Sequence, residues 1–94
     1  MYAIAFDLDT AKLKETYDKN SWQNAYNEIK SFLENEGFTR QQGSVYFGDK
    51  VNAVTCIIAT QKMAAQFSWF SDSVKDIQML RIEEHSDLSP ALTR

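Results

Sequence analysis

Residues 2–9, YAIAFDLD, decide the fold because they combine the alternation of a β-strand with an acidic residue near its end. Large apolar side chains occupy every second position: Tyr2, Ile4, Phe6 and Leu8. Alternate residues of a strand point to opposite faces, so one face is bulky and apolar and the other carries Asp7. Such a strand packs its apolar face against helices in a two-layer sandwich. We therefore expect Asp7 on the uncovered face of a sheet.

The composition predicts one small globular domain. The chain has 94 residues, of which 44% are hydrophobic and 13% aromatic, so it is too short for two domains and too apolar to be disordered. A domain of this size buries only about 60–65% of its unfolded surface, and a dimer would add stability. The net charge of −3 gives no long-range attraction to nucleic acid or to anionic membranes. A polyanionic partner would need a local basic cluster.

The sequence favours a cytoplasmic location. Cys56 is the only cysteine and lies in an apolar run, so no disulfide framework can form. Asp7 interrupts what would be the apolar part of a signal peptide, and no apolar run approaches the roughly 20 residues of a spanning helix. We expect a soluble protein with no membrane partner.

Two segments have the spacing of helices. Apolar residues at helical spacing, with Ser21 as the N-cap and Gly37 just past the end, predict a helix over 22–36. A second helix is predicted over 52–68, because its Ala- and Gln-rich half outweighs the β-branched residues of its first half. The polar segment Thr10–Asn20 is either a loop or a short helical turn.

Three further strands complete the pattern. Residues 38–47 alternate around Gln42-Gly43, which predicts a hairpin of two short strands. Residues 74–83 predict a last strand whose apolar face switches between Met79 and Leu80, as a bulge or the burial of both faces in a dimer would explain.

The order of elements is βαββαβ, and it predicts an α+β fold. We expect a ferredoxin-like sandwich with an antiparallel sheet in the order 4-1-3-2 and both helices on one face. The domain covers residues 1–85, and residues 86–94, with Pro90, form a polar tail.

This topology predicts where the polar side chains meet. We expect the first and third strands to be central, adjacent and parallel, with their C-terminal ends side by side. If Val45 and Phe47 join the core, Ser44 and Tyr46 point to the same open face as Asp7. A carboxylate, a hydroxyl and a phenol would then converge.

The last strand is expected beside the first and antiparallel to it, which brings its start to the same end of the sheet. Lys75 is then the nearest cation to Asp7, and Asp76 is a second acid. Arg40 and Arg81 are further candidates for binding a phosphate.

A plain structural interpretation competes with each functional one. Asp7 could be a strand-end carboxylate that accepts backbone N–H bonds from the next loop. Ser44 and Tyr46 could be sheet or interface residues, and Trp69 and Phe70 are better explained as core or dimer contacts than as a base-stacking platform.

Motifs of the common enzyme classes are absent from the sequence. The single His85 has no second His or Cys to complete a zinc site, so we expect a solvated or dimer-edge histidine. There is no Gly-rich phosphate loop, no G-x-S-x-G elbow and no Cys/His pair.

Motifs along nearly the whole chain resemble the virulence-associated protein D (VapD) family. They are, in order, MYAIAFDL at the start, GF at 37–38, QGSVY at 42–46, Trp69, SVKDI at 73–77 and IE…SD near the end. The family's last strand often reads S-V-R-D-I-R, whereas this chain has Lys75 and Gln78. One cation is therefore missing and another lacks the arginine fork, which predicts weaker phosphate binding.

The resemblance implies a small bacterial endoribonuclease, the toxin of a toxin–antitoxin pair with a small protein antitoxin. It implies a ferredoxin-like homodimer similar to a CRISPR-associated endonuclease family. In both families the acid that ends the first strand is essential, which corresponds to Asp7, and the QGSVY motif carries Ser44 and Tyr46.

Asp7, Ser44 and Tyr46 are therefore the predicted catalytic residues, and Arg40, Lys75 and Arg81 the predicted RNA-binding residues. Asp7 would act either as a general base on the RNA 2′-hydroxyl or, paired with a second Asp7 in a dimer, as ligand of a divalent cation such as magnesium. The alternatives are a non-catalytic dimer that binds RNA or a protein, and a small-molecule-sensing regulator.

Overall fold

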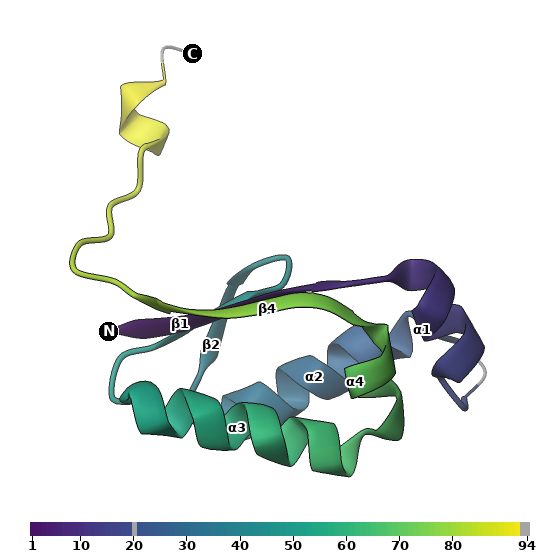
Figure 1. Cartoon of the computed structure of the whole chain (residues 1–94). Helices are drawn as coiled ribbons and strands as arrows, with labels where there is room; N and C mark the ends of the chain where they lie inside the picture. Colours follow the sequence, from purple (N-terminus) through teal and green to yellow (C-terminus); the bar gives the residue numbers. More distant parts are fainter. Residues whose placement is uncertain (20, 93–94) are drawn as a thin grey trace.

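The computed structural model describes residues 1–19 and 21–92, which form a four-stranded antiparallel sheet with helices on one face (Figure 1). The elements in chain order are β1 (Tyr2–Leu8), α1 (Thr10–Thr16), α2 (Asn24–Asn35), β2 (Thr39–Gln42), β3 (Val45–Gly48), α3 (Ala53–Gln66), α4 (Ser68–Ser73), β4 (Val74–Arg81) and a 3₁₀ turn (Ser89–Ala91). The strand order β2-β3-β1-β4 is 4-1-3-2 read from the other edge. The predicted ferredoxin-like α+β fold is confirmed.

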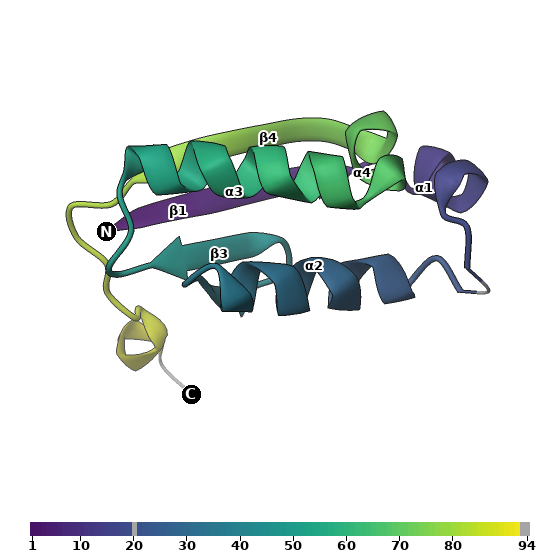
Figure 2. The same ribbon diagram turned by 90° about the horizontal axis from the view of Figure 1, so that it is seen from below.

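The helices lie in a single layer against the sheet. Seen from below, α3 crosses β1 and β4, α2 runs along β3, and α1 and α4 sit together beyond the end of β1 (Figure 2). The core between the layers takes Ile4, Phe6 and Leu8 from β1 and Ile29 and Leu33 from α2. None of the helices within residues 1–19 and 21–92 has the length and hydrophobicity of a membrane-spanning segment.

The central strand β1 is antiparallel to both of its neighbours. Ala3 lies opposite Phe47 of β3 and opposite Leu80 of β4. The expectation that the first and third strands are parallel is wrong. A helical crossover that skips one position makes β2 run with β1, and the hairpin then turns β3 against both. The end of β1 therefore meets the start of β3.

The predicted helices form close to their expected bounds. Asn52 caps α3 through a reciprocal capping box with Thr55, and Gly37, with φ of +97°, ends α2 in the left-handed region. The segment after β1 is a short helix, because the Asp9 carboxylate accepts a hydrogen bond from the Lys12 N–H at 3.1 Å. Asn20, which ends the predicted segment Thr10–Asn20, lies outside the described residues.

The helix α4 is not predicted by the sequence. Phe67 ends α3 in an extended conformation, and the chain then turns once more before β4. Trp69 and Phe70 of this turn are buried, and the Trp69 ring stacks on Phe67 at 5.0 Å between centroids. The interpretation of both aromatics as core residues is confirmed.

The strand β4 carries a bulge at its start and apolar residues on both faces. The register shifts where Leu8 pairs with Val74 and Asp7 with Asp76, which leaves Lys75 as the extra residue. This bulge precedes the switch of apolar face and does not explain it, because Met79 pairs with Ile4 and Leu80 with Ala3.

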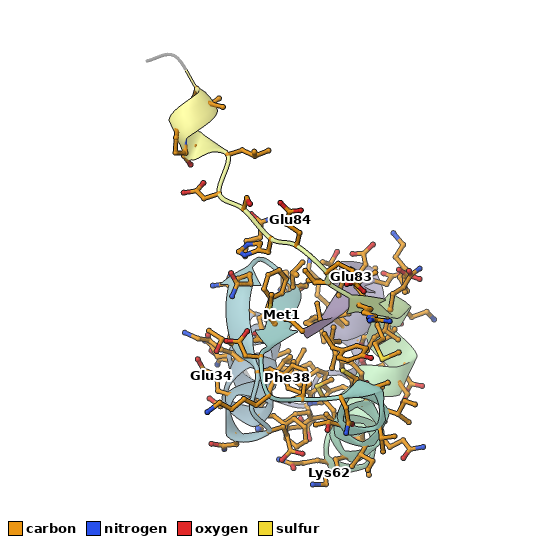
Figure 3. The ribbon with its side chains drawn as sticks, turned by 90° about the vertical axis from the view of Figure 1, so that its left-hand side faces the viewer. Met1, Glu34, Phe38, Lys62, Glu83 and Glu84 are labelled. Atoms are coloured by element: carbon orange, nitrogen blue, oxygen red, sulfur yellow. The ribbon has the colours of Figure 1, made fainter. Side chains whose placement is uncertain are left out.

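Beyond β4 the chain leaves the sandwich on the open side of the sheet (Figure 1). Figure 3, viewed from the Met1 end, shows Glu83 and Glu84 on this segment, above the sheet, and Lys62 on the far side of the helix layer. The described residues of the predicted tail, 86–92, are exposed. Its last two residues, 93 and 94, lie outside the described part of the chain.

Candidate active site

Asp7 lies on the open face of the sheet. It is exposed, whereas Phe6 and Leu8 on either side of it are buried. The alternation of the strand therefore places the carboxylate as the sequence predicts. The capping interpretation does not apply to Asp7, because Asp9 accepts the N–H of the following helix.

A second carboxylate faces Asp7 from the neighbouring strand. Asp76 of β4 is the direct cross-strand partner of Asp7, and residues so paired have Cβ atoms about 4.5–5.5 Å apart on one face. The Gln78 side-chain amide donates a hydrogen bond to Asp76 Oδ1 at 3.2 Å. Like charges directly opposite each other weaken a sheet. The pairing of β1 with β4 thus places two acids side by side on the open face of the sheet.

The two predicted cations of β4 lie at opposite ends of that strand. Lys75 is exposed and is the extra residue of the bulge, next in the chain to Asp76. Arg81 is opposite Tyr2 and forms an ion pair with Glu83 at 2.9 Å. Tyr2 and Asp7 are five positions apart along β1, which is about 17 Å. Within one chain, Arg81 is not part of the site.

Ser44 lies beside the end of β1, although not through the expected parallel pairing. It is half-buried in the turn before β3, and its carbonyl accepts the N–H of Phe6 at 3.1 Å. This hydrogen bond fixes the hairpin turn one residue before Asp7.

Tyr46 points to the opposite face from Asp7. It is 2% exposed and stacks on Phe6, with ring centroids 6.1 Å apart. The expectation that Tyr46 shares the open face with Asp7 is therefore wrong. The reason is steric: Val45 and Phe47 lie opposite the small residues Ala5 and Ala3, which leave room on the open face, and Tyr46 fills the core.

Tyr46 and Ser44 instead meet in a cavity on the helix side of the sheet. The cavity has a volume of about 360 Å³ between α2 and the β2–β3 hairpin. Its polar lining residues are Tyr26, Asn27, Lys30, Arg40, Ser44 and Tyr46. The sequence predicts a role for three of these, Arg40, Ser44 and Tyr46, but not for the three from α2. Their signal was the helical spacing of Tyr26 and Lys30, four residues apart, which also fits an ordinary amphipathic helix.

Two tyrosines show how charge is distributed around the cavity. Burial raises the pKa of Tyr46, Arg40 lowers it in part, and Glu34 raises it. Burial also raises the pKa of Tyr26, with a further contribution from the charge of Asp7. Both phenols are therefore neutral at physiological pH. The charge of Asp7 thus raises the pKa of Tyr26 in the cavity wall, although the Asp7 side chain is on the other face of the sheet.

The acid pair has the donor types that a hard divalent cation uses. Among the described residues, no group of three or more His, Cys, Asp or Glu side chains could hold a metal ion. Magnesium commonly takes one or two carboxylates and completes its shell with water and substrate phosphate, so Asp7 and Asp76 fit this chemistry. His85 is exposed and packs edge-on against Phe47, with centroids 5.0 Å apart, away from the acids.

We predict that Tyr46→Phe will retain the fold and the pH dependence of any RNA cleavage. The substitution keeps the stack on Phe6, and a phenol with a raised pKa does not titrate between about pH 6 and 9. Thermal unfolding and a pH–rate profile check this, with Tyr46→Ala as the control that loses the ring and about 3–5 kcal/mol of stability. A shifted alkaline limb in Tyr46→Phe would assign proton transfer to Tyr46.

Comparisons with known proteins are consistent along the chain. The family model for the CRISPR associated protein Cas2 matches residues 1–88. The chain is 49% identical over 94 residues to "Endoribonuclease VapD 2" of Riemerella anatipestifer, covering 99% of this chain and 100% of that protein. It is 50% identical over 93 residues to "Endoribonuclease VapD homolog" of Helicobacter pylori, covering 98% and 96%. With "Endoribonuclease VapD" of Dichelobacter nodosus the identity is 40% over 89 residues, covering 95% and 94%. The Cas2 family model also matches most of the chain, and the resemblance seen in its motifs is confirmed. The chain therefore belongs to the VapD family.

Proposed function

We propose that this protein is an endoribonuclease whose reacting group is Asp7, supported by Asp76. The observation that carries the proposal is the cross-strand pair of carboxylates on the open face of the sheet. The relatives at 49% and 50% identity are named endoribonucleases. A chain this similar over its whole length is expected to keep their chemistry.

In the metal-independent route, a carboxylate oxygen of Asp7 takes the proton of an RNA 2′-hydroxyl. The 2′-oxygen then forms a bond to phosphorus, the bond from phosphorus to the 5′-oxygen breaks, and that oxygen takes a proton from water. In the alternative route, Asp7 and Asp76 would hold a divalent cation, which would supply an activated water when bound.

Basic groups near the acid pair are expected to offset the phosphate charge. Lys75 in the β4 bulge is the nearest predicted one, and Arg40 lines the cavity beyond the hairpin turn. Ser44, between Asp7 and this cavity, is proposed to hydrogen-bond the RNA. Tyr46 is proposed as a positioning residue, because its hydroxyl is on the cavity side. Arg81 would contact only a longer RNA.

We predict that Asp7→Asn will lower RNA cleavage by about 10²- to 10⁴-fold, the usual contribution of a positioned proton-transfer group. Asp49→Asn is the matched control, since Asp49 is an exposed aspartate just after β3, at the far end of β1. The measurement is the single-turnover cleavage rate of a labelled RNA, with and without EDTA. Loss of wild-type cleavage in EDTA selects the metal route.

Equal cleavage by Asp7→Asn and the wild type would refute the role of Asp7. The rival function, a non-catalytic RNA-binding dimer, would be favoured if the wild type binds RNA but gives no cleavage products with any divalent cation tried. The net charge of −3 is the observation that favours this rival.

We further propose that two copies pair through their open faces. Val45, Phe47 and Leu80 make the middle of this face apolar, and Leu80 is 43% exposed. A homodimer would cover this surface and bring two Asp7–Asp76 pairs toward each other.

We predict that Leu80→Lys will convert the dimer to monomer, because a charged side chain would be buried in the interface. Ile58→Lys is the control, since Ile58 is 44% exposed but lies on α3 in the helix layer. Light scattering after size-exclusion chromatography gives the mass of each variant. A dimeric Leu80→Lys protein would exclude this interface.

The cellular role is proposed to be that of a cytoplasmic toxin restrained by a small protein antitoxin. Cleavage of RNA in the cell that makes the enzyme would require such a restraint. The buried thiol of Cys56 suits a reducing compartment. Growth arrest on expression of the wild type, but not of Asp7→Asn, is the expected result, and arrest by both would dissociate toxicity from cleavage.

A further inference from the structure

The cavity between α2 and the β2–β3 hairpin is built from three separate elements. Tyr26, Asn27 and Lys30 come from successive turns of one face of α2, Arg40 comes from β2, and Ser44 and Tyr46 come from the turn and start of β3. These residues offer two cationic groups, three hydroxyls and one amide. Such a set of donors suits an anionic oxygen ligand.

The two cations of the cavity are available for a ligand. Within the described residues the ion pairs are Lys19–Glu28, Lys62–Glu36 and Arg81–Glu83, so Lys30 and Arg40 belong to none of them. The Arg40 Nε–H donates to the carbonyl of Gly43 at 2.9 Å. This bond anchors the guanidinium in the cavity and leaves its terminal N–H donors for a bidentate contact.

Two acidic groups act on the same cavity from its surroundings. The charge of Glu34, an exposed residue of α2, raises the pKa of Tyr46, and the charge of Asp7 raises the pKa of Tyr26. Neither carboxylate lines the cavity, whereas both cations do. An anion inside it would therefore meet the cations first.

The cavity adjoins Asp7 around the end of the hairpin. The Phe6 N–H binds the Ser44 carbonyl at 3.1 Å, so Asp7 is the first residue of β1 beyond the hairpin turn. Ser44 and Tyr26 both line the cavity, and the pKa of Tyr26 is raised in part by the charge of Asp7. A strand of RNA held at Asp7 can thus pass over the turn into the cavity.

We propose that this cavity binds the nucleotide next to the scissile bond, with its phosphate against Lys30 and Arg40. The proposal rests on the function proposed above and adds the contacts that hold the substrate. The volume of about 360 Å³ lies in the range of small-ligand sites and exceeds what a phosphate alone requires. The Asn27 amide and the hydroxyls of Tyr26 and Ser44 are left to contact the sugar and base.

The test measures RNA binding separately from cleavage. Fluorescence anisotropy with a short labelled single-stranded RNA gives the dissociation constant of Asp7→Asn protein at several salt concentrations. Adding Lys30→Gln or Arg40→Gln is expected to weaken binding about tenfold each, as loss of a charged hydrogen bond does. Each is expected to reduce the slope of log affinity against log salt by about 0.7.

Lys50→Gln is the matched control, because it removes one positive charge from an exposed lysine after β3, away from the cavity. Arg40→Lys keeps the charge but not the fork, and is expected to recover the salt slope but only part of the affinity. Circular dichroism and thermal unfolding of each variant confirm that it is folded.

In an otherwise wild-type chain, Lys30→Gln should raise KM about tenfold and leave kcat within about threefold, as expected for a group that binds ground and transition states equally. The proposal would be overturned if Lys30→Gln and Arg40→Gln had the same dissociation constant for RNA as Lys50→Gln. That result would count against it even if the wild type cleaves RNA. Dependence of affinity on Lys30 and Arg40 in a protein that never cleaves would uphold the binding site and reject the nuclease.

Discussion

The antiparallel pairing of β1 with β4 is the constraint on which the site depends. It places Asp76 directly opposite Asp7. The bulge at Lys75 allows the next residue of β1, Leu8, to be buried and to pair with Val74. A slip of one residue would turn the β4 side chains to the other face and separate the two acids. Ile77 of β4 favours this register, because it lies opposite Phe6 and packs against the core.

Opposite charges lie on the two sides of the sheet at this end. The carboxylates of Asp7 and Asp76 are on the open face, whereas Lys30 and Arg40 line a cavity on the helix side. The short hairpin turn at Ser44 separates them. A molecule of net charge −3 can in this way offer a local cationic surface to a polyanion without attracting it from afar.

Local patterns predict the elements but not the directions of neighbouring strands. Alternation in β1 correctly places Asp7 on the open face, and helical spacing with Gly37 as terminator correctly predicts α2. Tyr46 illustrates the limit: its strand is apolar at Val45 and Phe47, which suggests that these two enter the core, yet Ala3 and Ala5 make room for them outside. This cross-strand fit depends on residues that are 40 and 44 positions apart in the sequence.

The short helix α4 and the pairing of Asp7 with Asp76 both depend on tertiary contacts, which the local sequence does not reveal. The turn at Trp69 and Phe70 forms because both rings find the core, which local propensity does not reveal. Asp76 is recognisable in the sequence as an acid near the site, but only the register makes it the direct neighbour of Asp7.

The central claim, that Asp7 and Asp76 act as one unit, is tested most directly by a double-mutant cycle. Single-turnover RNA cleavage would be measured for wild type, Asp7→Asn, Asp76→Asn and the double variant. Residues that act together give strongly non-additive losses. We predict that the double variant cleaves within about tenfold of the slower single variant. Losses that multiply, or an Asp76→Asn protein as fast as wild type, would contradict the account.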